Sequence, residues 1–248
     1  PADLADTMNK FFIDKVTRLR DGIQQDDNDP LETMREVMRE RLCKFTLKPV
    51  TPAEVEKIIA GLKNSKSTGL DYLDTYVIKR ATKEILPAIT HIVNLSIRDS
   101  LFPKAWKKSK VVPLLKKDDR FDPKNYRPVA LLSILSKILE RSVYVQLVQY
   151  LDSNALFHPN HHGSRRAHST CTALIQMYDT WVHAADEGKL AGVMMLDLSA
   201  AFDMVDHGLL LKKLKLLGLD EQAVNWFESY LSNRSQSACI DVCLSSFL

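Results

Sequence analysis

The sequence has little cysteine. Its 248 residues include four cysteines, too few and too scattered for the disulfide framework of a small secreted domain. Cys239 and Cys243 lie four positions apart, but neither a second cysteine pair nor a histidine pair at ligand spacing completes a zinc set. We therefore interpret the cysteines as ordinary buried thiols and expect neither a disulfide scaffold nor a zinc module.

Long apolar segments are also missing. No uninterrupted apolar run approaches the ~20 residues that span a bilayer, and no basic segment followed by an apolar one opens the chain. Internal repeats and low-complexity tracts are absent. A phosphate-binding glycine loop is excluded, because Ala60 and Ser65 stand where that motif requires glycine in the stretch around GLKNSKSTG. These absences argue against a membrane-spanning or repeat protein and indicate an intracellular protein without a membrane partner.

The net charge is small, but the charges are unevenly distributed. Thirty-four lysines and arginines against 31 acids leave a formal charge of +3, and 45% of the residues are hydrophobic, as in ordinary globular proteins. Residues 21–40 hold seven acids and two bases, a net of −5, whereas residues 104–127 hold nine bases and three acids, a net of +6. The second segment predicts a local anion-binding surface.

Helical patterns dominate the chain. Spacings of three and four between apolar residues, together with start and stop signals, predict helices at 4–20, 31–42, 53–61, 75–81, 83–100 (interrupted or reset at Pro87), 131–151, 169–186, 207–217 and 221–232. Thr51 with Glu54 forms a capping box. Strands are predicted at 110–115, 190–196 and 235–242, with a further short one conceivable at 44–50. Many helices with few, late strands predict a helix-rich α+β fold.

The continuous apolar run Leu190–Leu196 is typical of a strand buried on both faces. Asp197 would then stand at the carboxyl end of a rigid strand, where it could ligate a hard divalent cation. The small residues Ser199, Ala200 and Ala201 behind it would let backbone N–H groups approach a polyphosphate. An aspartate making only turn hydrogen bonds is an equally good interpretation of Asp197 taken alone.

Two further aspartates follow the turn. Asp206 immediately precedes an apolar-periodic segment and is predicted to be a helix N-cap, and Asp203 is expected to have a structural role. Two-metal phosphoryl chemistry requires several carboxylates around ions ~3.5–4 Å apart. Asp197 by itself does not complete such a centre.

The basic segment supplies complementary charge. Lys116 follows the predicted strand 110–115, and Arg127 is held in extended geometry by the following Pro128. Arginine can hold a phosphate through two parallel hydrogen bonds, whereas lysine acts as a mobile point charge. The loop HHGSRRAHST lacks a carboxylate or thiol at ligand spacing, so it is either a basic loop that contacts a nucleic-acid backbone or a plain exposed loop.

Several blocks, in order, resemble the reverse transcriptase domain of non-LTR (LINE-type, jockey-like) retrotransposons. The family's Lys-Ser-Pro-Gly-x-Asp block is similar to LKNSKSTGLDYLDTYVIK, and its fingers block to FPKAWKKSKVVPLLKKDDRFDPKNYRPVALLSILSKILER. Its Gly-Phe-Arg-x-Gly-x-Ser-Thr block is similar to HHGSRRAHSTCTAL, its first palm motif to MMLDLSAAFDMVDH, and the following segment to WFESYLSNRSQSACID. The stretch that joins such polymerases to an upstream endonuclease resembles LADTMNKFF. The resemblance therefore covers nearly the whole chain.

This resemblance implies a right-hand polymerase fold, with an N-terminal helical extension at 1–96, fingers at 97–190 and an incomplete palm at 191–248. The implied activity is RNA-directed DNA polymerisation, in which dNTPs are added to a primer 3′-OH by two-metal phosphoryl transfer with Mg²⁺ or Mn²⁺. The implied partners are an RNA template, a DNA primer and dNTPs, with an endonuclease domain upstream. Nuclear residence follows from the family.

The resemblance also implies roles for single residues. Asp197 corresponds to the first catalytic, metal-binding aspartate, and the Leu198 carbonyl is a further ligand. Lys116 and Arg127 look like the residues that hold the triphosphate. The remaining implied contacts are the Ala200 and Ala201 N–H groups to the phosphates, Phe202 as a gate that disfavours a 2′-hydroxyl, and Arg165 and Arg166 to nucleic acid.

The sequence departs from the family at Tyr72, Ser164 and Ala167, which puts local template contacts in doubt. The family's Gly-x-Pro-Gln-Gly and aromatic-x-Asp-Asp motifs do not occur in these 248 residues. We therefore expect a fragment of a longer polypeptide that does not polymerise alone. The alternative is a transposon-derived remnant that acts only as a nucleic-acid-binding or structural module.

Overall fold

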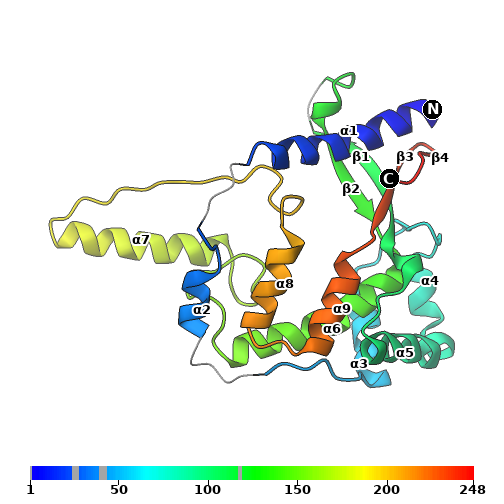
Figure 1. Ribbon diagram of the computed structural model, residues 1–248, viewed down its shortest axis with the longest axis horizontal. Coiled ribbons are helices and arrows are strands. Elements are labelled where there is room, and N and C mark those ends of the chain that lie inside the picture. Colours follow the sequence, from blue (N-terminus) through cyan, green and yellow to red (C-terminus); the bar gives the residue numbers. More distant parts are fainter. Residues whose placement is uncertain (1, 24–27, 39–43, 117–118) are drawn as a thin grey trace. The chain divides into compact units, whose positions relative to one another are not determined.

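The computed structural model describes residues 2–23, 28–38, 44–116 and 119–248. Within these ranges the chain forms α-helices and one small sheet (Figure 1). The helices are α1 (Ala2–Asp21), α2 (Glu32–Met38), α3 (Pro52–Gly61), α4 (Thr75–Arg80), α5 (Thr82–Asp99), α6 (Ile134–Ser153), α7 (Thr170–Asp186), α8 (His207–Leu216) and α9 (Glu221–Leu231). Short 3₁₀ turns are η1 (Lys104–Lys107) and η2 (Pro123–Asn125), and the strands are β1 (Lys108–Leu115), β2 (Tyr126–Leu131), β3 (Ser235–Ile240) and β4 (Cys243–Leu244). The predicted mixed, helix-rich class is confirmed.

The helices follow their local sequence signals. At the start of α3, the Thr51 side chain accepts from the Glu54 N–H while a Glu54 oxygen accepts from the Thr51 N–H at 2.7 Å, so the predicted capping box is confirmed. The hydrogen bond from the Thr51 backbone also lowers the pKa of Glu54. The expected interruption at Pro87 is wrong, because α5 runs through it. Residues 39–42 of the second predicted helix lie outside the described residues.

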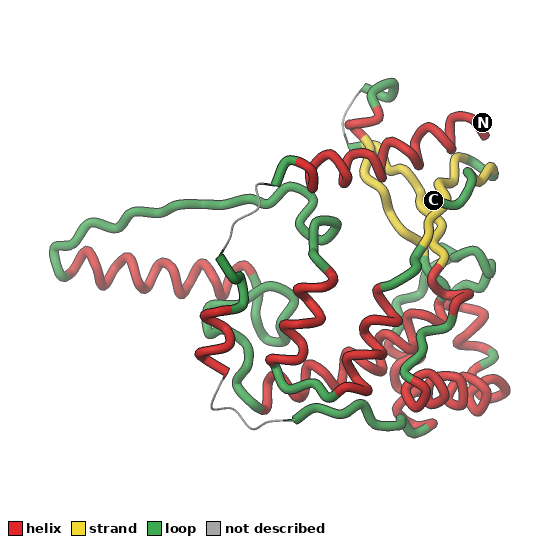
Figure 2. Tube along the Cα trace, viewed as in Figure 1, coloured by secondary structure: helices red, strands yellow, loops and turns green. Residues whose placement is uncertain are grey.

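The strands form one mixed sheet in the order β2-β1-β3-β4; Figure 2 draws the strands in yellow. β1 and β2 are an antiparallel hairpin, whereas β1 and β3 run parallel, with Lys108 opposite Ser235 and Val111 opposite Ala238. The conceivable strand at 44–50 is reduced to an isolated bridge between Phe45 and Leu219.

α1 covers one face of this sheet. Met8 and Phe12 of α1 form a buried cluster with Val111 of β1. Asn9 is fully buried, and its side chain donates to the Ser246 carbonyl at 3.0 Å and accepts from the Gln236 side chain at 3.0 Å. Because a buried amide is stable only when its hydrogen bonds are made, these contacts fix where the helix lies on the sheet.

The predicted strand at Leu190–Leu196 is wrong. These residues are extended but belong to no strand, and their side chains are exposed, Met194 by 84%. An apolar run becomes a buried strand only where neighbouring strands satisfy its N–H and C=O groups. The described sheet consists of β1, β2, β3 and β4, and residues 190–196 belong to none of them.

The chain divides into two compact units. One comprises residues 1–148 and 202–248, and the other comprises residues 149–201. The second unit contains α7, which has no buried residue. Among the described residues, no helix is both long and apolar enough to cross a membrane.

The loop between α3 and α4 packs tightly on the junction of β2 and α6. A Cβ added to Gly69 would lie 2.8 Å from the Ser133 nitrogen and 2.9 Å from the Leu132 carbonyl carbon. Nearby, the Ser133 hydroxyl donates to the Asp71 carboxylate at 2.5 Å. Glycine is therefore required by the close approach of two backbones.

We expect Gly69→Ala to destabilise the chain by about 1–3 kcal/mol, because a methyl group would force these backbones apart. The measurement is the urea midpoint followed by circular dichroism. Gly61→Ala is the matched control, since nothing lies within 4 Å of a Cβ at Gly61 and alanine favours the helix end. Equal midpoints for the two variants would contradict the packing argument.

Candidate functional site

Lys116 and Arg127 lie at the loop end of the β1–β2 hairpin. Arg127 is opposite Leu114, and the Lys116 N–H extends the ladder by donating to the Asn125 carbonyl at 2.6 Å. Residues two apart on a strand share a face, so Leu114, Lys116 and Arg127 all project from the same side. Diagonal neighbours of this kind lie ~7–8 Å apart, and both basic side chains are exposed. The structure brings these two predicted residues together.

The opposite face of the hairpin is the one beneath α1. Val111 and Tyr126, which alternate with the Lys116–Arg127 set, pack against Met8, Phe11 and Phe12. The two basic residues are therefore directed away from the N-terminal helix.

Asp197, Leu198, Ala200 and Ala201 all lie in the unit of residues 149–201. Asp197 and Leu198 are exposed, and residues 199–204 form a succession of turns. Ala200 has a φ of 53°, the left-handed conformation that alanine rarely adopts. Residues 200 and 201 thus lie in a turn, where neither N–H group belongs to a helix or a strand.

Phe202 begins the return of the chain into the larger unit, and its ring is 93% exposed. The following turn is attached to α1, because the Arg20 guanidinium donates to the Asp203 carbonyl at 3.2 Å and to the Val205 carbonyl at 3.4 Å. Lys116 and Arg127 belong to the same unit as Phe202, whereas Asp197 does not.

Asp206 is the N-cap of α8. Its side chain accepts from the Leu209 N–H at 2.8 Å, which satisfies one of the free donors at the helix start. The prediction for Asp206 is confirmed.

Arg165 and Arg166 lie in the loop before α7. Arg165 is half-buried, pairs with the Asp152 carboxylate at 3.4 Å and lies over the Phe157 ring at 5.1 Å. Arg166 is exposed. In the same loop, the His162 ring contacts the Thr172 hydroxyl at 2.9 Å and the Gln176 side chain at 2.8 Å. Of the two arginines, Arg166 is the freer to meet a phosphate.

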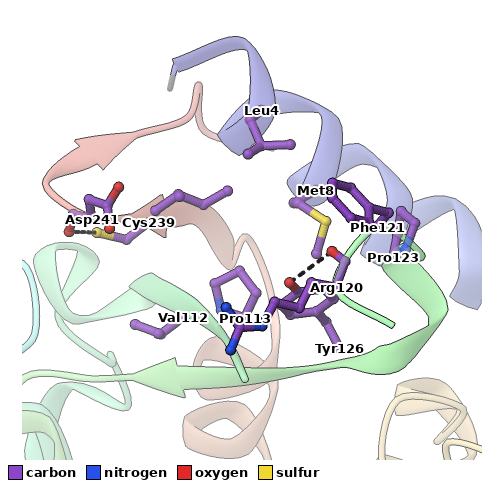
Figure 3. Close-up of a pocket in the computed structure, with 11 residues that line it drawn as sticks. Leu4, Met8, Val112, Pro113, Arg120, Phe121, Pro123, Tyr126, Cys239 and Asp241 are labelled. Atoms are coloured by element: carbon purple, nitrogen blue, oxygen red, sulfur yellow. Dashed lines mark hydrogen bonds between the residues drawn. The ribbon is translucent and has the colours of Figure 1, made fainter. Parts of the chain in front are cut away.

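Several pockets are lined by described residues of the larger unit. One of about 350 Å³ lies between α1, the sheet and the β1–β2 loop (Figure 3). A second, of about 510 Å³, is lined by α1 residues, Asp203 and Arg234. A third, of about 270 Å³, lies between α6 and α9 beside Glu140, whose pKa is raised by burial. None of the predicted site residues is among the residues that line them.

Comparison with known proteins identifies the family. Residues 114–243, more than half of the chain, match the family model described as reverse transcriptase (RNA-dependent DNA polymerase). The chain belongs to the reverse transcriptase family. This match confirms the reverse transcriptase family that the sequence predicted, and the matched segment contains Lys116, Arg127, Asp197 and Phe202.

Curated relatives of this reverse transcriptase domain come from mobile elements. The chain is 32% identical to the RNA-directed DNA polymerase from mobile element jockey of Drosophila funebris, over 80% of this chain and 22% of that protein. It is 29% identical to the probable RNA-directed DNA polymerase from transposon X-element of Drosophila melanogaster, over 73% of this chain and 20% of that protein. It is also 29% identical to the retrovirus-related Pol polyprotein from type-1 retrotransposable element R2 of Popillia japonica, over 76% of this chain and 25% of that protein. The chain spans about a fifth to a quarter of the length of these relatives.

Reverse transcriptases generally use Mg²⁺, which prefers six oxygen ligands in octahedral geometry. In the described part of this domain, no group of three or more histidine, cysteine, aspartate or glutamate side chains is placed to hold a metal ion. Asp197 with the Leu198 carbonyl offers one carboxylate and one carbonyl. These residues do not fit a complete two-metal centre.

Sequence reasoning missed Arg20 and Phe121. The Arg20 contact joins residues 183 positions apart, and no local pattern signals it. Phe121 carries a weak signal, since it is the one aromatic residue within the polar stretch KKDDRFDPKN.

Proposed function

We propose that this reverse transcriptase domain is the fingers and first part of the palm of a right-hand polymerase from a non-LTR, jockey-like retrotransposon. Residues 1–96 would be the helical extension, 97–190 the fingers and 191–248 the incomplete palm. The observation that carries the proposal is the common open face of Lys116 and Arg127 within the matched segment. In the natural protein, the reaction would add dNTPs to a DNA primer on an RNA template.

Each site residue then has a definite task. Lys116 and Arg127 would neutralise and orient the triphosphate, since positioning and charge neutralisation dominate phosphoryl transfer. The N–H groups of Ala200 and Ala201 would add hydrogen bonds to it. Phe202 would exclude a 2′-hydroxyl by shape, and Asp197 with the Leu198 carbonyl would contribute ligands to Mg²⁺.

The remaining assignments rest on the family. We place the protein in the nucleus, with RNA template, DNA primer and dNTPs as partners, Arg165 and Arg166 on the nucleic acid, and an endonuclease domain upstream. The 248 residues alone are expected to be inactive, because the described part of the chain brings no second carboxylate beside Asp197 to complete a metal-binding cluster.

Primer extension tests the proposal. The natural protein that contains these residues is expected to extend a DNA primer on an RNA template, and residues 1–248 are not. Arg127→Ala is expected to raise KM for dNTPs by about 10–100-fold, the loss of one bidentate charged contact. Lys104→Ala, an exposed base in the η1 turn that precedes the same hairpin, is the matched control. No extension by the natural protein, or equal KM values for the two variants, would overturn the proposal.

A second candidate is a remnant that binds nucleic acid without catalysis. The absence of a three-ligand cluster from the described residues favours it. The coding sequence after Leu248 discriminates: a Gln-Gly motif followed by a double aspartate supports the polymerase, and an in-frame stop supports the remnant.

A further inference from the structure

The loop between β1 and β2 has a fixed shape in its described part. Asp119 accepts from the Phe121 N–H at 2.9 Å, and Asp122 accepts from the Lys124 N–H at 2.9 Å. The Tyr126 hydroxyl donates to the Arg120 carbonyl at 3.0 Å. Side-chain bonds of this kind define a turn much as backbone bonds do. The loop therefore presents its side chains in set directions.

Phe121 is held in water by this loop. Its side chain is 97% exposed, although burying a phenylalanine would gain about 1.5–3 kcal/mol. Because the Phe121 N–H donates to the Asp119 side chain, the conformation of the loop itself keeps the ring exposed. The ring is consequently available to a ligand.

A pocket of about 350 Å³ opens beside this ring (Figure 3). Its walls are mainly apolar, supplied by Leu4 and Met8 of α1 and by residues of three strands. Arg120 and Asp241 also line it, which gives one hydrogen-bond donor group and one acceptor group. Apolar walls with a few convergent polar groups suit a flat heteroaromatic ligand.

The charge at this end of the hairpin favours an anionic chain. Residue 116 and residues 119–127 include four bases and two acids, and the two acids already accept backbone N–H groups. The pocket lies on the α1 side of the sheet, so it is separate from the face that carries Lys116 and Arg127.

We propose that Phe121 and this pocket bind an unpaired base of a single-stranded nucleic acid. The base stacks on the Phe121 ring, Arg120 and Asp241 meet its polar edge, and Arg120 and Lys124 attract the adjoining phosphates. Stacking on an aromatic side chain contributes about 1–3 kcal/mol per base and tolerates any base. The inference rests on the proposed polymerase only in taking nucleic acid as the partner.

Binding of a fluorescein-labelled single-stranded RNA to the 248-residue chain tests this site. Phe121→Ala is expected to weaken binding roughly 5–150-fold, the factor that corresponds to the stacking energy. Phe121→Leu, which keeps an apolar side chain without a ring face, should be weakened similarly. Phe121→Trp should bind as tightly as wild type and show indole fluorescence quenched by the RNA, beyond any quenching in wild type. Each variant should keep the wild-type urea midpoint, because the Phe121 side chain is exposed.

An abasic oligonucleotide of the same length separates stacking from charge. Wild type and Phe121→Ala should bind it equally. If Phe121→Leu binds the RNA with wild-type affinity, any apolar contact suffices, as it would for a protein segment, and the proposal is overturned. Unchanged affinity in Phe121→Ala would overturn it as well. If Phe121 governs binding but the natural protein extends no primer, the polymerase proposal fails and the base site stands.

Discussion

Replacing Asp197 by asparagine is expected to reduce primer extension by the natural protein about 10³-fold or more. Asparagine keeps the size of the side chain but removes the negative charge that would hold a divalent cation. Loss of several kcal/mol of transition-state stabilisation corresponds to this factor. Single-turnover extension with saturating primer and template isolates the chemical step from substrate binding.

Asp206→Asn is the matched control, since the same change is made nine residues later on a helix cap. Asparagine is as good an N-cap as aspartate, so α8 should persist and extension should stay within a few-fold of wild type. A similar loss in both variants would mean that Asp197 acts through folding and holds no cation.

The elements that sequence predicts well are those with local causes. The capping boxes and N-caps at Thr51 and Asp206 involve residues within three positions of each other, so the chain's own pattern contains the information. The helix limits follow, usually within a few residues. Asp197, placed by the same reasoning at a strand end, depended on a strand that needs distant partners, and the run before it is exposed.

Lys116 and Arg127 show the intermediate case. Their charge and the restraint from Pro128 are visible in the sequence, but their common face follows only from the register that pairs Leu114 with Arg127. The contact of Arg20 with the Asp203 carbonyl has no sequence signal, because any arginine near the end of α1 has the same local pattern. The common face of Lys116 and Arg127 and the contact of Arg20 with Asp203 depend on residues far apart in the sequence, so only the structure reveals them.

Trp226→Ala should destabilise the larger unit by about 3–5 kcal/mol, the range for removing a buried large aromatic side chain. Trp226 is 1% exposed. Its ring stacks on Tyr230 at 5.5 Å between centroids and meets Phe102 edge-on at 5.8 Å. Losing the indole leaves a cavity among α5, α9 and the turn that leads to β1. The measurement is the free energy of unfolding from urea titration.

The indole N–H adds a separable part of this effect. It donates to the buried Ser96 hydroxyl at 3.0 Å, and that hydroxyl donates to the Leu101 carbonyl at 2.7 Å. Trp226→Phe keeps most of the apolar volume but loses this bond and a small part of the ring, so about 1–2 kcal/mol should be lost, less than in Trp226→Ala. Trp106→Ala, at a half-buried tryptophan, should have a smaller effect than Trp226→Ala. If Trp226→Phe lowers the free energy of unfolding as much as Trp226→Ala does, the hydrogen bond rather than the packing holds α9 against α5. If neither variant changes the free energy of unfolding, Trp226 is not at the centre of this core.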